Sequence, residues 1–187
     1  MKFPSLATYL LFLLCAVYVF PQHQTLTSFP AGGYVTNAQS IAESTKDSEN
    51  FKMLMEAVKA ANLEEALDKS GPFTVFAPSD GAFFRLDNAE LDKLDYLTDE
   101  SVLSSLLKYH IVAGRLTASK ILQAMCRGEG TATFTTIHGE KIRASMNGID
   151  IVLTDSNGNS ATITSADSSY RNGVVHEIDS VIMPSRF

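Results

Sequence analysis

The chain has no tryptophan, only two cysteines in 187 residues, and no long run of charges of one sign. It also lacks a G-x-S-x-G turn, a phosphate-binding glycine loop and an H-E-x-x-H pair, so the common hydrolase, nucleotide and zinc-protease motifs find no support. Nucleic-acid binding is disfavoured because a net charge of −6 repels phosphate backbones. The absences argue against an enzyme with a familiar motif and against a nucleic-acid-binding protein.

The two cysteines are Cys15 and Cys126. Cys15 lies in an apolar N-terminal stretch, and its removal with that stretch would leave one cysteine and no internal disulfide. A domain of about 140 residues can bury enough apolar surface to fold without a disulfide. Cys126 is expected to be a small apolar residue at a helix end, and pairing with another chain is the alternative.

Residues 1–21 are predicted to be an export signal or an N-terminal anchor. Lys2 is followed by an uncharged, mostly apolar stretch, Leu6 to Phe20, of about 15 residues, the length of a signal-peptide core. A membrane-spanning helix needs roughly 20 apolar residues, and this stretch ends at Pro21. Cys15 could carry a lipid, although the residue before it is larger than such sites prefer. Cleavage, lipidation and retention stay open, and the expected location is secreted, periplasmic or cell-surface.

Residues 22–46 are polar and irregular and are predicted to be a linker, so the folded domain is predicted to occupy residues 47–187. The first part of this domain is predicted to be helical. Apolar residues recur at helical spacing from Phe51 to Val58, and the clearest helical pattern starts at Asp99. Helices are predicted over residues 51–58, 63–70, 80–86, 88–97, 100–110 and 118–125.

After Gly130 the pattern favours strands. They are predicted over residues 133–137, 141–144, 149–153, 161–164 and 174–178, with one early strand over 73–77. Hairpin turns are indicated at His138-Gly139, Asn147-Gly148 and Asn157-Gly158. The last turn begins at Asp155 like a calcium loop, but it lacks the required glycine and glutamate. Helices followed by a meander of strands predict an α+β fold.

Three segments, in order, carry a resemblance to a known family: TVFAPSDGAF (Thr74–Phe83), KYHIVAGRL (Lys108–Leu116) and NGVVHEIDSVIMP (Asn172–Pro184). At these positions the sequence resembles the fasciclin (FAS1) domain family, and the resemblance covers about Asp47 to Pro184. It implies a FAS1-type fold, a wedge of two small β-sheets with several α-helices packed on one side. It also implies an exported or cell-surface adhesion protein with no catalytic activity and no cofactor. The implied partner is a protein or polysaccharide at a cell surface or matrix, and weak homo-oligomers are a further expectation.

Four polar residues of the motifs, Thr74, Asp80, His110 and His176, are predicted to form a structural polar core. Asp80 follows the helix-capping Ser79, so its carboxylate is expected at the positive end of that helix. His110 shares a helix face with leucines and is expected to be neutral and hydrogen-bonded. Strand alternation places His176 among apolar neighbours. Two histidines without a third ligand make no zinc site, so no metal is expected.

Candidate partner contacts come from the resemblance. The tyrosine–histidine motif has been linked to receptor binding in some family members, and Tyr109 is expected nearer the surface than His110. Asp167-Ser168 stand where some relatives carry an Asp-Ile pair tied to integrin recognition, and the missing isoleucine argues against that recognition here. The segment Asp167–Arg171 is therefore expected to be a polar surface loop. The candidate contact residues are Tyr109, His110, Asp167, Ser168, Tyr170 and Arg171.

Two functional hypotheses follow. The favoured one is an exported, non-catalytic adhesion or binding module, at a cell surface or secreted, that recognises a protein or glycan. The alternative is a small-ligand-binding or enzyme-like domain with a pocket lined by His110 and His176. Both histidines in one open cleft would support the alternative, whereas both bonded to backbone would oppose it.

Overall fold

The computed structural model describes residues 38–46, 48–86 and 99–187. The predicted export signal at 1–21, the predicted linker as far as residue 37 and the predicted helix at 88–97 lie outside the described residues. Within the described stretches, no helix is both long and apolar enough to cross a membrane.

The described helices are short and mostly begin at a polar side chain. They are α2 (Ile41–Thr45), α3 (Lys52–Ala60), α4 (Glu64–Lys69), α5 (Asp80–Phe83), α7 (Glu100–Tyr109) and α8 (Ala118–Arg127). The side chains of Ser40, Ser79, Asp99 and Thr117 accept a first-turn N–H of α2, α5, α7 and α8 respectively, which fixes where these helices start.

The predicted linker is wrong at its C-terminal end, where residues 41–45 form helix α2. Ser40 and Glu43 make a reciprocal capping box at its start. Ile41 and Ala42 are buried in the core, and the Ile41 N–H donates to Oδ1 of Asn172 at 2.9 Å. The polar composition of residues 22–46 hid this helix, because its five residues include only one large apolar side chain, Ile41.

The strands are β1 (Phe73–Pro78), β2 (Ile111–Ala113), β3 (Thr131–Thr135), β4 (Lys141–Asn147), β5 (Asp150–Thr154), β6 (Ser160–Tyr170) and β7 (Gly173–Ile178). They hydrogen-bond in the order β2-β1-β7-β6-β5-β4-β3. β1 and β7 are parallel, and the other neighbours are antiparallel. All six predicted strands are present. Five of them match the predicted ends within a few residues, whereas β6 is far longer than predicted, and the short strand β2 was not predicted.

The long strand β6 belongs to two small sheets. It pairs with β5 through residues 160–162 and with β7 through residues 163–170, with register shifts after Ile163 and after Ser165. The other ends of the two sheets approach at a bridge between Val112 and Thr136 and at a 2.8 Å hydrogen bond from the Ile137 N–H to the Ile111 carbonyl. The expected wedge of two small sheets is confirmed. The expectation that 167–171 is a loop is wrong, because residues 167–170 end β6.

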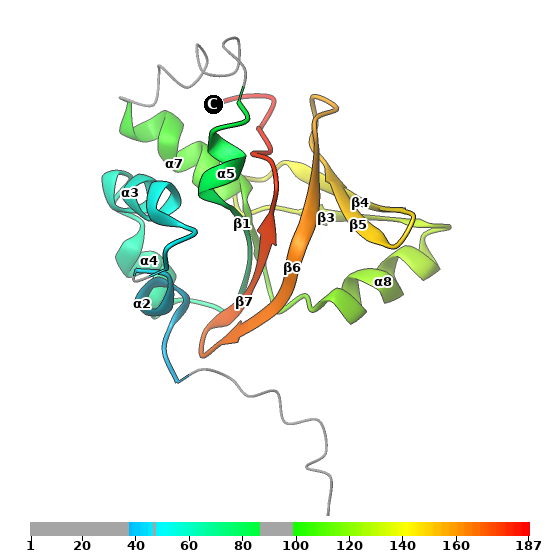
Figure 1. Cartoon of the computed structure of the whole chain (residues 1–187), viewed down its shortest axis with the longest axis horizontal. Coiled ribbons are helices and arrows are strands. Elements are labelled where there is room, and N and C mark those ends of the chain that lie inside the picture. The colour runs from blue at the N-terminus through cyan, green and yellow to red at the C-terminus, as the bar shows by residue number, and fades with distance from the viewer. Residues whose placement is uncertain (1–37, 47, 87–98) are drawn as a thin grey trace, which may run out of the picture. The chain divides into compact units, whose positions relative to one another are not determined.

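Side-chain alternation on β1 and β7 separates the two larger core clusters, and a third, small cluster holds Ala82, Leu106, Val181 and Met183. Val75 and Val175 pack against helices α2, α3, α4 and α7 in what we call the helix-side core. Phe76 and Ile178 pack against α8 and strands β3 to β6 in what we call the inter-sheet core. Figure 1 shows α2, α3, α4, α5 and α7 on one side of β1 and β7, and α8 against β3 and β4. The expectation of several helices packed on one side is confirmed.

Candidate functional site

The three motifs lie side by side, because β1 carries the first, β2 the second and β7 the third. Thr74 on β1 is fully buried. Its hydroxyl donates to the Gly114 carbonyl at 2.7 Å and accepts from the Leu116 N–H at 2.8 Å. The single hydroxyl therefore holds the turn that follows β2 against β1.

His176 on β7 completes the same junction. Its Nε2 lies 2.7 Å from the Leu116 carbonyl, and its Nδ1 accepts from the Asp167 N–H at 3.2 Å. Because a carbonyl only accepts, Nε2 carries the proton and the ring is the neutral Nε2–H tautomer. Burial lowers the pKa of His176, which keeps it neutral. Both ring nitrogens are thus occupied by backbone groups.

Asp80 caps a helix, but not the helix that was expected. Its carboxylate accepts from the Met53 N–H, in the first turn of α3, at 2.9 Å, and its own N–H donates to the Asn50 carbonyl at 2.8 Å. Ser79 caps α5, as predicted. The first residue of α3 is preceded by Phe51, which supplies no side-chain cap, so Asp80 fills that role from a distance in sequence.

Tyr109 is fully buried, so the expectation that it lies nearer the surface is wrong. Its hydroxyl donates to the Lys141 carbonyl at 3.0 Å and accepts from the Ser156 N–H at 3.3 Å. Burial raises the pKa of Tyr109. Leu107, in the last turn of α7, packs in the helix-side core and Tyr109 packs in the inter-sheet core. Tyr109 therefore cannot contact a partner directly in this conformation.

His110, at the end of α7, is also buried, with 3% of its surface exposed, so it cannot contact a partner directly either. Its Nδ1 lies 2.9 Å from the Leu106 carbonyl and must donate, which leaves Nε2 as the acceptor of the neutral ring. Nε2 is the one buried side-chain nitrogen or oxygen without a hydrogen-bond partner among the described residues. Burial lowers the pKa of His110 from 6.5 to about 4.

The two histidines do not share a pocket, which contradicts the alternative hypothesis of a His110/His176 site. His110 lines a cavity of the helix-side core together with Val75 and Val175. His176 follows Val175 and so faces the opposite side of the sheet, where it stacks on Phe76. In the described part of the chain, no group of three His, Cys, Asp or Glu side chains could hold a metal ion.

The candidate contacts after Ala166 form a rigid surface, Asp167–Arg171, which we call the 167–171 surface. Asp167 has φ 65°, in the left-handed region, and its carboxylate accepts from the Ala118 N–H at 2.8 Å. Ser168 and Tyr170 are half-buried members of β6. Arg171 is exposed, and its guanidinium lies 3.3 Å from the Asp68 carboxylate.

Arg115 organises the 167–171 surface from the second motif. Its guanidinium donates to the carbonyls of Tyr170 and Gly173, both at 2.7 Å, and to that of Arg171 at 3.3 Å. This role was not predicted from the sequence. The only available signal was an arginine beside a glycine turn, and its targets are more than fifty positions away.

Other exposed features lie away from the motifs in sequence. Ile149, at the tip of the β4–β5 hairpin, is 93% exposed, and Cys126 on α8 is exposed as a free thiol. The expectation of a small apolar helix-end residue holds for the position of Cys126 on α8, but the side chain does not join the core.

Comparisons with known proteins agree with this architecture. Residues 49–184 match the family model described as Fasciclin domain. The chain is 38% identical over 151 residues to protein sll1483 of Synechocystis sp., which covers 79% of this chain and 75% of that protein. It is 31% identical over 145 residues to the transforming growth factor-beta-induced protein ig-h3 of Sus scrofa, covering 78% of this chain and 19% of that protein.

A solved structure has the same fold. It is a FAS1 domain pair from the insect cell adhesion molecule Fasciclin I, with a TM-score of 0.65 and 18% identity. The match covers 78% of this chain and 51% of that chain, so this chain spans about half the length of the solved structure.

Proposed function

Because the chain belongs to the fasciclin domain family, we propose that it is an exported, non-catalytic binding module that recognises a protein at a cell surface or in a matrix. The observation that carries this proposal is the use of the motif side chains. Thr74, Asp80 and His176 are all engaged by backbone N–H or carbonyl groups. Side chains held in this way order the fold, and this use supports a structural role over one as acid, base or nucleophile.

The 167–171 surface is the proposed contact. Its backbone is fixed by Arg115 and by the Asp167 carboxylate, so little conformational entropy is lost when a partner binds. Arg171 presents an exposed guanidinium, a group that is enriched among the energetically dominant residues of interfaces. Its guanidinium also lies 3.3 Å from the Asp68 carboxylate, an ion pair that restricts the side chain. The rigid backbone and the oriented arginine support recognition of a protein surface with complementary charge.

Export is supported by the apolar stretch within residues 1–21, which has the length of a signal-peptide core. A retained or lipid-bearing stretch would anchor the module to a membrane, and cleavage would release it. Anchoring would hold many copies on one surface, and weak self-association would have a similar effect. Either arrangement raises avidity without a new contact.

The test is an attachment assay with beads that carry the full-length chain, presented to cells of the organism that encodes it. We expect attachment above that of uncoated beads. Arg171→Ala should weaken attachment about tenfold, whereas Arg143→Ala, which removes another exposed arginine, from β4, should change it less than about twofold.

Each failure has a separate meaning. No attachment over uncoated beads would refute the binding module, and equal effects of the two variants would refute the 167–171 surface as the contact. Protease treatment of the cells should abolish attachment. Loss of attachment after periodate oxidation of cell-surface sugars, with protease having no effect, would identify a glycan and refute the protein partner.

A further inference from the structure

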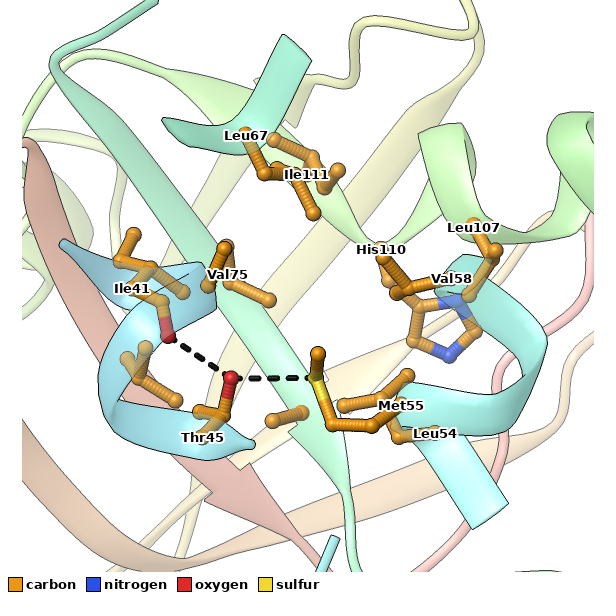
Figure 2. Close-up of a pocket in the computed structure, with 13 residues that line it drawn as sticks. Ile41, Thr45, Leu54, Met55, Val58, Leu67, Val75, Leu107, His110 and Ile111 are labelled. Atoms are coloured by element: carbon orange, nitrogen blue, oxygen red, sulfur yellow. Dashed lines mark hydrogen bonds between the residues drawn. The ribbon is translucent and has the colours of Figure 1, made fainter. Parts of the chain in front are cut away.

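Two neighbouring cavities lie between the helices and the sheet. The smaller one, of about 30 Å³, is drawn in Figure 2, and the larger one, of about 120 Å³, shares three of its lining residues. The shared residues are Leu54, Leu107 and His110. Figure 2 shows the imidazole ring beside Leu54, Val58 and Leu107, the side chains of α3 and α7. His110 therefore belongs to the common wall of both cavities.

The larger cavity offers a ligand one polar atom. The described residues that line it come from α3, β1, α5, α7 and the segment after β7, and His110 is the one polar side chain among them. In the smaller cavity, the hydroxyl of Thr45 is already engaged by the Ile41 carbonyl at 2.7 Å and the Met55 sulfur at 3.1 Å. Nε2 of His110 is thus the unpaired polar atom of this apolar region.

The chemistry of Nε2 selects the occupant. Since Nδ1 donates to the Leu106 carbonyl, Nε2 presents a lone pair and needs a hydrogen-bond donor. A buried water typically makes two to four hydrogen bonds. The side chains that line this cavity offer it one, at Nε2, so a single water would lack at least one partner. A purely apolar occupant would leave Nε2 unpaired, at an unfavourable free energy.

We propose that this cavity is a binding site for a small apolar molecule with one hydroxyl group, which donates its hydrogen bond to Nε2 of His110. Apolar cavities of about 150 Å³ stay dry and bind benzene, so a volume near 120 Å³ suits a molecule of about five heavy atoms. Met53, which is 38% exposed, lines the larger cavity and marks the side on which a ligand enters. Methionine adapts its shape readily, which suits an entrance.

Asp80 adds a further link between this site and the motifs, beside His110 itself. By accepting the Met53 N–H, it ties α5 to the start of α3, and residues of both helices line the larger cavity. The site is distinct from the 167–171 surface, since none of the residues of that surface lines either cavity. The site thus stands independently of the proposed partner contact.

The test compares 1-butanol with methyl propyl ether, which have the same four carbons and one oxygen, whereas only the alcohol has a donor. The full-length chain is titrated with each while NMR follows the methyl groups of Leu54 and Leu107 and the Nε2 resonance of His110. We expect saturable shifts at millimolar concentration and an affinity for the alcohol about threefold to tenfold higher. The Nε2 resonance should move with the alcohol and stay unchanged with the ether.

Two matched variants of α3 test the location. Ala57→Leu adds volume at the wall of the larger cavity and should weaken binding of the alcohol more than tenfold. Ala60→Leu adds the same volume at an exposed position of the same helix and should leave binding unchanged.

Three results would overturn the site: no saturable shift with either compound, equal affinities for both, or an Nε2 resonance that is unmoved at saturation with the alcohol. The first result would identify a cavity that holds water or nothing. If Ala57→Leu fails to fold, the comparison of the two compounds on the unaltered chain decides. The attachment assay uses other variants, so each proposal can fail alone.

Discussion

Phe76 and His176 face each other on the parallel strands β1 and β7, with ring centroids 5.6 Å apart and ring planes 24° from parallel. The contact joins the first motif to the third, and the hydrogen bond from Nε2 of His176 to the Leu116 carbonyl adds the second. The three motifs are therefore joined through Phe76, His176 and Leu116, and both ring nitrogens of His176 bond to backbone groups. Their shared purpose is to hold three neighbouring strands together.

Thr74→Val should destabilise the protein by about 2–3 kcal/mol. The substitution keeps the shape of the side chain but leaves the Gly114 carbonyl and the Leu116 N–H without their partner in a buried site. Thr74→Ser keeps both hydrogen bonds and should cost about 1 kcal/mol, from the lost methyl group. Urea unfolding measures both changes in the free energy of unfolding, provided that its slope against urea concentration is the same in all variants. Equal losses in the two variants would contradict the role of the hydroxyl.

Stability should rise with pH between about 4 and 6.5. The folded pKa of His110 lies near 4, below its ordinary value of 6.5, so in this interval the unfolded chain binds more protons than the folded one. The contribution is fully present above pH 6.5 and is lost as the pH falls towards 4, by up to about 3 kcal/mol. Unfolding free energies measured across this interval test the sign and the size.

His110→Leu should flatten this pH dependence without abolishing it, because burial lowers the pKa of His176 in the same direction. His138→Gln, which removes a half-buried histidine near the C-terminal segment, serves as the control and should leave most of the slope in place. A slope that is unchanged in His110→Leu would contradict the assignment.

Asp80→Ala should destabilise the protein by about 1 kcal/mol and speed hydrogen exchange at the Met53 N–H. The reason is the loss of the carboxylate that caps α3. Ser79→Ala removes the cap of α5 and should leave the Met53 N–H protected. If Ser79→Ala exposes Met53 as much as Asp80→Ala does, the capping of α3 by Asp80 is wrong.

Arg115→Lys should loosen the turn between β6 and β7. A lysine cannot reproduce the forked contact with the Tyr170 and Gly173 carbonyls, because it carries one compact ammonium group. Amide exchange at residues 170–173 should become about tenfold faster, which corresponds to a loss of about 1.4 kcal/mol. Arg127→Lys, an exposed substitution at the end of α8, should leave exchange in that turn unchanged.

The sequence was most informative where local pattern and tertiary environment agree. Alternating apolar residues gave the strands, and glycine turns with positive φ at Gly139, Gly148 and Gly158 marked the hairpins. The inward position of His176 followed from alternation alone. These features depend on residues within a few positions of one another, and sequence periodicity reports on that range.

Errors arose where contacts distant in sequence decide the outcome. Tyr109 was expected nearer the surface than His110 from its position on α7. The helix ends between the helix-side core and the inter-sheet core, and the ring of Tyr109 packs in the inter-sheet core. The polar residues after Ala166 suggested a loop, yet β7 supplies hydrogen-bond partners that extend β6 through two register shifts. Asp80 was assigned to its own helix because its true partner, Met53, is 27 positions away.

The sharing of β6 between the two sheets has a mechanical consequence for the proposed binding role. A tensile load that passes from one sheet to the other along this strand travels through covalent bonds of the main chain. It need not shear a ladder of hydrogen bonds at that seam. The seam between the two sheets is consequently held by covalent continuity along β6, in addition to the hydrogen bonds on either side of it.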